Sequence, residues 1–90
     1  MGTNWSSAGS GLTRREAIAS AEAYVNSYQN YHVDSIEYVQ SGKDYDLCFV
    51  INGHVYRVDV WKNDRTYMVD LVYIFTRHNK PNTSPVSSIY

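Results

Sequence analysis

Residues 33 to 75 carry apolar side chains at nearly every second position, and short polar segments interrupt the alternation at 41–44, 52–53 and 62–65. A period of two is typical of a β-strand, whose successive side chains point to opposite faces of a sheet. The pattern therefore predicts four strands, at residues 33–40, 45–51, 54–61 and 66–75. Asn52-Gly53 favours a tight antiparallel hairpin, because both central positions of a type I′ turn need positive φ.

The period changes to that of a helix in residues 12–31, "LTRREAIASAEAYVNSYQNY". Apolar residues recur there at positions 17, 18, 21, 24, 25 and 28, which places them on one helical stripe. Thr13 is followed three residues later by Glu16, and this spacing is typical of a capping box at a helix N-terminus. We expect a helix from about Arg14 to about Gln29.

Together these elements predict an α+β fold of two layers, with one N-terminal helix packed on a four-stranded antiparallel β-meander in the order α-β-β-β-β. The single domain is expected to span residues 12–76. Residues 1–11 are mostly Gly, Ser, Thr and Asn, which is typical of a flexible N-terminal tail. Residues 77–90 contain both prolines and are expected to form a C-terminal tail.

The turn lengths predict which residues lie opposite each other in the sheet, and the resulting pairs on one face are all apolar. The expected pairs include Ile36 with Phe49, Phe49 with Tyr56, Leu47 with Val58, Tyr45 with Val60, and Val58 with Val69. This face is expected to receive the apolar stripe of the helix.

The other, outer face of the predicted sheet is half charged and half apolar, and an exposed apolar patch of that size is typical of an interface. We interpret it as the binding surface for a protein partner or for a second copy in a weak homodimer. The alternative is that a tail of the same chain covers it. The residues predicted to form this surface are Val50, Val55, Trp61, Met68, Val72 and Ile74, with Arg57 and Asp70 as its polar rim.

The charged half of that face contains the candidates for chemistry. Asp46 is expected opposite Asp59, and two close carboxylates can share a proton or hold a cation. Arg57 next to both favours a solvated ion network instead. No histidine is expected on the outer face near Cys48 to act as its base. The three histidines of the chain are dispersed. We therefore expect no enzymatic activity, no cofactor and no metal site.

Charge and composition narrow the class of partner. The 90-residue chain has a net charge of −1, so we expect no binding to duplex nucleic acid and no attraction to a membrane. Nine tyrosines are the unusual feature of the composition. Most of them fall on the helix-facing side, so we interpret them as core residues, with stacking of a ligand on exposed rings as the alternative. Residues 1–11 lack the basic start and apolar centre of a signal peptide, and localisation stays open.

The segments "LTRREAIASAEAYV", "VDSIEYVQ" and "YDLCFVINGHVYRVDV" follow one another in the chain. A helix that opens on Thr-x-x-Glu-Ala-Ile, followed by a meander with Tyr-x-Val-x-Val, resembles the PepSY domain family over about 60 residues. The arrangement of a helix on an antiparallel sheet is also similar to that of cystatins. Both resemblances imply non-catalytic binding, because PepSY domains are associated with restraining peptidases and cystatins block cysteine proteases.

These observations lead us to expect a small protein-binding module that is inhibitory or regulatory towards a peptidase or another enzyme through its outer sheet face. One alternative is a binder that uses its tyrosines to hold single-stranded nucleic acid or a small ligand. Another is an accessory protein of a phage or mobile element that blocks a host enzyme.

Overall fold

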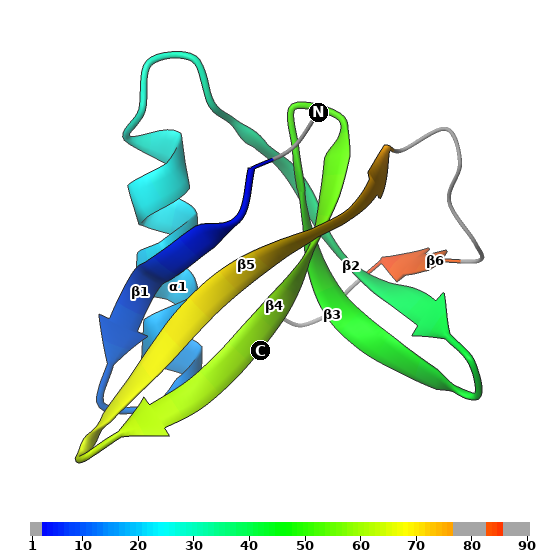
Figure 1. Ribbon diagram of the computed structural model, residues 1–90. Helices are drawn as coiled ribbons and strands as arrows, with labels where there is room; N and C mark the ends of the chain where they lie inside the picture. Colours follow the sequence, from blue (N-terminus) through cyan, green and yellow to red (C-terminus); the bar gives the residue numbers. More distant parts are fainter. Residues whose placement is uncertain (1–2, 77–82, 86–90) are drawn as a thin grey trace.

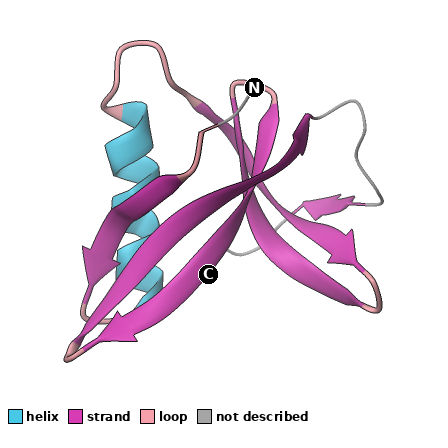
Figure 2. Cartoon of the chain, viewed as in Figure 1, coloured by secondary structure: helices cyan, strands magenta, loops and turns pink. Residues whose placement is uncertain are grey.

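The computed structural model describes residues 3–76 and the backbone of residues 83–85. Within them one helix lies against a twisted antiparallel sheet whose strands are arranged in the order β1-β5-β4-β3-β2-β6 (Figures 1 and 2). The elements are β1 (Trp5–Gly11), α1 (Arg14–Asn26), β2 (Val33–Ser41), β3 (Asp44–Ile51), β4 (His54–Asn63), β5 (Thr66–Thr76) and β6 (Thr83–Pro85).

The prediction of a four-stranded sheet is wrong, although the α+β class and the helix-on-sheet arrangement hold. Residues of the supposed N-terminal tail form β1, which pairs with β5 at one edge of the sheet. Three residues of the supposed C-terminal tail form β6, which pairs with β2 at the other edge. The rest of that tail, 77–82 and 86–90, lies outside the described residues. The polar and glycine-rich composition of residues 1–11 predicts a flexible tail, but the small residues instead allow β1 to pack closely on the helix.

The helix begins as expected and ends earlier than expected. The Thr13 hydroxyl accepts a hydrogen bond of 3.1 Å from the Glu16 backbone N–H, which confirms the N-terminal cap. The helix stops at Asn26, and the Ser27 hydroxyl donates to the Tyr24 carbonyl at 2.6 Å. The Asn26 side chain then accepts a hydrogen bond of 2.8 Å from the Val33 backbone N–H, which ties the helix end to the start of β2. Side-chain hydrogen bonds of this kind compete with the helical ladder and end it.

The predicted register is correct in the first hairpin and wrong in the last. Ile36 lies opposite Phe49 in β2 and β3, as expected. In β4 and β5, Val58 lies opposite Leu71 instead of Val69. The loop there consists of residues 64 and 65 alone, with Asp64 at a positive φ of 59°, so the strands are longer than expected and the register moves by two. A shift of two leaves each side chain on its expected face.

The sheet splits into two arms beyond the middle of β3 and β4. Their pairing runs from the Asn52-Gly53 turn only as far as Cys48 opposite Arg57. Figure 1 shows β4 and β5 continuing towards the side where β1 and α1 lie, while β2 and β3 turn away. The expected pairs of Leu47 with Val58 and of Tyr45 with Val60 are therefore absent from the described register. Strong right-handed twist of this kind is a normal property of long antiparallel strands.

The close packing of β1 on the helix depends on two glycines. A Cβ atom at Gly9 would meet the Ala17 carbonyl oxygen and would lie 2.5 Å from the Ala21 nitrogen and 2.7 Å from its Cβ. A Cβ atom at Gly11 would lie 2.7 Å from the Ala17 nitrogen. The backbone of β1 thus lies directly on the alanine side of α1, and a larger residue at either position would push the two elements apart.

Replacing Gly9 with alanine should therefore destabilise the protein by about 1–3 kcal/mol, as overpacking of a tight interior typically does. Urea unfolding followed by circular dichroism measures the change. The matched control is Ser10→Ala, whose side chain is exposed and should alter the free energy of unfolding by less than about 0.5 kcal/mol. Equal stability of the two variants would show that β1 does not lie on the helix.

Candidate functional site

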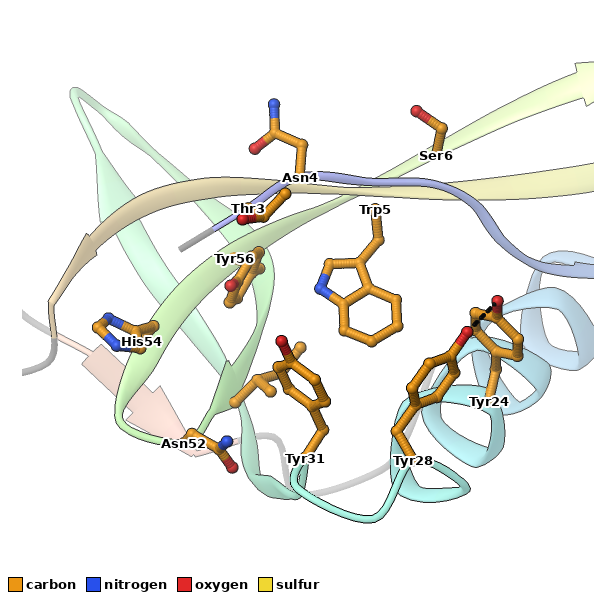
Figure 3. A pocket seen from close by; sticks show the side chains of 11 residues that line it. Thr3, Asn4, Trp5, Ser6, Tyr24, Tyr28, Tyr31, Asn52, His54 and Tyr56 are labelled. Carbon is orange, nitrogen blue, oxygen red and sulfur yellow. Dashed lines mark hydrogen bonds between the residues drawn. The ribbon is translucent and has the colours of Figure 1, made fainter. Parts of the chain in front are cut away.

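A cleft of about 510 Å³ opens at one end of the molecule, between the start of β1, the end of α1 and the β3–β4 turn (Figure 3). Its volume is within the range of about 300–1,000 Å³ that is typical of small-ligand sites. Five aromatic rings dominate its wall. The lining residues are Thr3, Asn4, Trp5, Ser6, Tyr24, Tyr28, Tyr31, Ile51, Asn52, His54 and Tyr56.

A bulge in β1 brings Trp5 into this cleft. Trp5 pairs with Leu71 and Gly9 with Val69, so four steps along β1 match two along β5. The extra length is taken up around Ser7, which has a positive φ of 51°. The Ser7 backbone N–H donates a hydrogen bond of 2.8 Å to the Asp70 carboxylate. The irregular segment is therefore fixed at its centre, and the Trp5 ring points towards the helix end.

Three tyrosines surround the indole of Trp5. Tyr24 belongs to the last turn of α1, and Tyr28 and Tyr31 lie in the segment between α1 and β2. Their ring centroids lie 5.9, 5.3 and 5.2 Å from that of Trp5. Figure 3 shows the indole with Tyr31 on one side and with Tyr24 and Tyr28 on the other. Each tyrosine is 42–43% exposed, so the rings that hold the indole also face the solvent.

The ring planes have a definite relation to one another. Trp5 makes angles of 85° with Tyr24 and 87° with Tyr31. Tyr28 makes angles of 78° and 81° with the same two rings, and 84° with Trp5. The planes of Trp5 and Tyr28 are nearly perpendicular to each other, and the planes of Tyr24 and Tyr31 are each nearly perpendicular to both. The Tyr24 and Tyr31 rings are therefore nearly parallel. In Figure 3 the indole lies between these two rings.

The polar groups of the cleft are partly engaged and partly free to bind. The Asn52 amide accepts from the His32 N–H at 3.0 Å and donates to the Asn30 carbonyl at 2.7 Å, so it holds the loop. Asn4 accepts from the Tyr73 N–H at 2.8 Å through Oδ1, and its Nδ2 donates to no described residue. The Nδ1 atom of His54 is buried and has no hydrogen-bond partner among the described residues. Buried polar atoms normally have one, so this nitrogen stands out.

The wall of the cleft carries no formal charge from Asp, Glu, Lys or Arg among its described residues. Burial raises the pKa of Tyr56, although hydrogen bonds from the Thr3 backbone and the Trp5 side chain act in the opposite direction. The hydrogen bond with Tyr24, 2.8 Å between the two hydroxyls, raises the pKa of Tyr28. Both of these phenols therefore stay protonated at physiological pH and add no negative charge to the cleft.

The outer-face surface predicted from the sequence is largely buried. Val50 is 2% exposed and Val55 is fully buried, and with Val39 and Cys48 they form a second core on this side of the sheet. Phe75 packs against it, because a bulge after Val55 places Phe75 opposite that residue. The expectation that these two valines are open to a partner is therefore wrong. Trp61 and Ile74 remain exposed, at 41% and 40%, and Met68 and Val72 are half-buried.

The charged residues of the outer face are arranged differently from the prediction. The Arg57 guanidinium binds both carboxylate oxygens of Asp59, at 2.6 and 3.0 Å, and lies opposite Val72 instead of Asp70. This contact raises the pKa of Arg57. Asp59 lies opposite Asp70 in the register, and Asp46 and Asp59 are not a described pair. Asp70 holds the bulge of β1 instead of forming the rim of an interface.

Burial raises the pKa of the Cys48 thiol to about 12, with the negative charge of Asp46 adding to the effect and Arg57 opposing it. At neutral pH the thiol is therefore neutral and is a weak nucleophile. No group of three or more His, Cys, Asp or Glu side chains within the described residues is placed to bind a metal ion.

The sequence interpretation missed the aromatic cleft. Trp5 was assigned to a flexible tail, and the tyrosines were assigned to the core, although Tyr24, Tyr28 and Tyr31 are all well exposed. Two signals were present. One is the tryptophan in a polar segment, because a large aromatic ring gains by burial, and the other is the three tyrosines within residues 24–31, close to the end of the helix.

Searches against models of protein families, curated proteins and solved structures returned no match for this chain. The resemblance to PepSY domains and cystatins therefore stays a prediction. In the part of the chain that the structure describes, no helix has the length and hydropathy that a membrane span requires.

The pKa of Cys48 leads to a test of the second core. Because the pKa is raised to about 12, the reactive thiolate is almost absent at pH 8 in the folded protein. Iodoacetamide at pH 8 should leave Cys48 unmodified in the native state and alkylate it in urea, as measured by mass spectrometry. Equally fast alkylation in the two states would show that the outer face is open.

Proposed function

We propose that this protein is a non-catalytic binding domain that holds an uncharged small molecule in the aromatic cleft lined by Trp5, Tyr28 and Tyr31. The observation that carries the proposal is the composition of the wall, which combines several aromatic rings with neutral hydrogen-bonding groups and, in its described residues, no charged side chain. Sites of this type bind by apolar contact and use a few polar atoms for orientation.

Binding without turnover is supported by the acid–base groups of the cleft. His54 is the single imidazole of the described wall, and the hydroxyls of Tyr28 and Tyr56 have raised pKa values. A hydrolytic or transfer reaction requires a nucleophile, a base that activates it and a group that stabilises the developing charge. The described wall offers one base candidate and no nucleophile next to it.

The two tryptophans permit a direct test, because Trp5 lies in the cleft and Trp61 lies far from it on the outer face of β4. In a Trp61→Phe variant, Trp5 is the sole source of indole fluorescence. We expect at least one of three uncharged probes, methyl β-glucoside, adenosine or benzyl alcohol, to change the Trp5 emission in a saturable way. Choline and adenosine monophosphate, which are charged, should not.

Variants of the cleft locate the response. In the Trp61→Phe background, Tyr31→Ala should weaken the binding of the responding probe by about tenfold, because an aromatic contact contributes up to about 1.5 kcal/mol. Tyr45→Ala is the matched control, since Tyr45 is 49% exposed and lies outside the described wall. A response restricted to charged probes, no response at all, or equal binding by both variants would contradict the proposal.

A second candidate is a protein-docking function of the outer face, including inhibition of a peptidase or self-association as a weak dimer. The exposed fractions of Trp61 and Ile74 support it, since large apolar side chains that remain in water are often part of an interface. Val50 and Val55, at the centre of the predicted surface, are buried. This candidate therefore depends on the exposed residues Trp61 and Ile74 at the edge of that surface.

Sedimentation velocity tests the dimer form of this candidate. If the outer face associates, Ile74→Lys should abolish any dimer seen at high micromolar concentration, because a charge at an apolar contact is costly to bury. Leu12→Lys is the control, as Leu12 is 73% exposed and lies between β1 and α1. A wild-type protein that stays monomeric at that concentration, or a dimer that survives Ile74→Lys, counts against self-association through this face.

A further inference from the structure

We infer that the ligand of the aromatic cleft is a saccharide, an uncharged pyranose ring that packs its C–H face on the rings beside Trp5 and turns its hydroxyls to the polar atoms of the wall. The inference rests on the proposed function and deepens it, because it names one class among uncharged ligands. Three properties of the cleft lead to it: its charge, the angles between its rings and the position of a buried polar atom.

Charge excludes ionic ligands. Phosphate and carboxylate groups are recognised by Arg, Lys or an array of backbone N–H groups, and the described wall contains neither basic side chain. A quaternary ammonium group binds over aromatic faces. A carboxylate nearby would add Coulomb attraction, and the described wall, which contains no Asp or Glu, does not supply it. A neutral saccharide has no net charge, so its binding requires neither a basic side chain nor a carboxylate.

The ring angles disfavour a flat heteroaromatic ligand. A nucleobase binds best when it stacks on an exposed aromatic face or between two parallel ones. The near-parallel pair in this cleft is Tyr24 and Tyr31, and the indole of Trp5 already lies between them. Tyr28 meets Trp5, Tyr24 and Tyr31 at angles of 78–84°, so these rings form corners instead of slots. A pyranose chair is thick and faceted, and it can contact two rings that meet at such a corner.

The buried polar atom of the wall matches a hydroxyl group. His54 Nδ1 is buried without a hydrogen-bond partner among the described residues. It belongs to the start of β4 at one side of the cleft, so a ligand that pairs with it must bring a hydrogen-bonding group to that side. A hydroxyl both donates and accepts, so it can pair with the imidazole nitrogen in either tautomer. A pyranose carries such groups around its ring.

Saturation-transfer NMR in the Trp61→Phe background tests the inference with named probes. The saccharides are cellotriose, maltotriose, mannotriose and chitotriose, and the comparison ligands are adenosine and benzyl alcohol. We expect at least one trisaccharide to bind, with the strongest transfer to the axial C–H protons on one face of a ring. The Trp5 fluorescence should change in the same titration.

Two variants distinguish binding in the cleft from non-specific binding. Tyr31→Ala should weaken the saccharide about tenfold by loss of the aromatic contact. His54→Leu should weaken it about fivefold by loss of one hydrogen bond, and should leave benzyl alcohol within about twofold. Tyr45→Ala is the control outside the cleft. The ¹H–¹⁵N spectrum of each variant shows whether it is folded, so that loss of binding is not confused with loss of structure.

The outcomes are distinguishable. Binding of a trisaccharide that both cleft variants weaken supports the inference. The inference is overturned if adenosine or benzyl alcohol binds in the cleft and no trisaccharide binds at a concentration of about 10 mM. The proposed function is then still supported. Saccharide binding that Tyr31→Ala does not affect overturns it as well, because the site is then elsewhere. If no probe binds, both proposals fail.

Discussion

The backbone of β1 lies on the alanine side of α1 without a side chain between them at Gly9 and Gly11. This contact determines the position of everything that precedes it in the chain. It fixes β1 as the edge strand beside β5, and the Ser7 bulge, held by Asp70, then directs Trp5 to the end of the helix. The cleft exists because a strand is held this close to a helix.

The aromatic cluster is both a structural anchor and a binding wall. Trp5 packs against the main core and is surrounded by three tyrosines, so it holds the first residues of β1 in place. The same tyrosines keep more than two fifths of their surface in water, which is more than an anchor requires. The same cleft contains His54 Nδ1, which is buried without a hydrogen-bond partner among the described residues, and such an atom has a cost because it loses its hydration.

The outer face of the sheet shows how a small domain can bury apolar residues on both sides of one sheet. The arms formed by β2–β3 and β4–β5 diverge, and the far end of β5 curls over the outer face. Phe75 packs there on Val50 and Val55, and Ile74 and Phe75 share a small cavity with Val39 and Cys48. Two of the apolar residues that suggested a partner, Val50 and Val55, are thus buried within this second core.

Periodicity in the sequence was enough to predict the helix start at Thr13, the four central strands and the first hairpin register. Each of these depends on local signals: a cap, an alternation, an Asn-Gly turn. Periodicity was not enough to predict β1. The position of β1 depends on the close fit of Gly9 against Ala21, and this contact between separate elements leaves no local pattern in the sequence. The shift in the last hairpin was missed because the turn there consists of residues 64 and 65 alone, whereas the polar segment of the sequence suggests a longer one, and the bulge at Val55 has no local pattern in the sequence.

The candidate site was the least predictable part, because its residues come from β1, the helix end and the β3–β4 hairpin and meet only in the folded chain. Its central claim is that Trp5 sits among Tyr24, Tyr28 and Tyr31. A NOESY spectrum of the Trp61→Phe variant tests this most directly, because every indole signal then belongs to Trp5. The account predicts cross-peaks from the Trp5 indole to the ring protons of all three tyrosines. Random-coil shifts for residues 5–11, with no such cross-peaks, would contradict it.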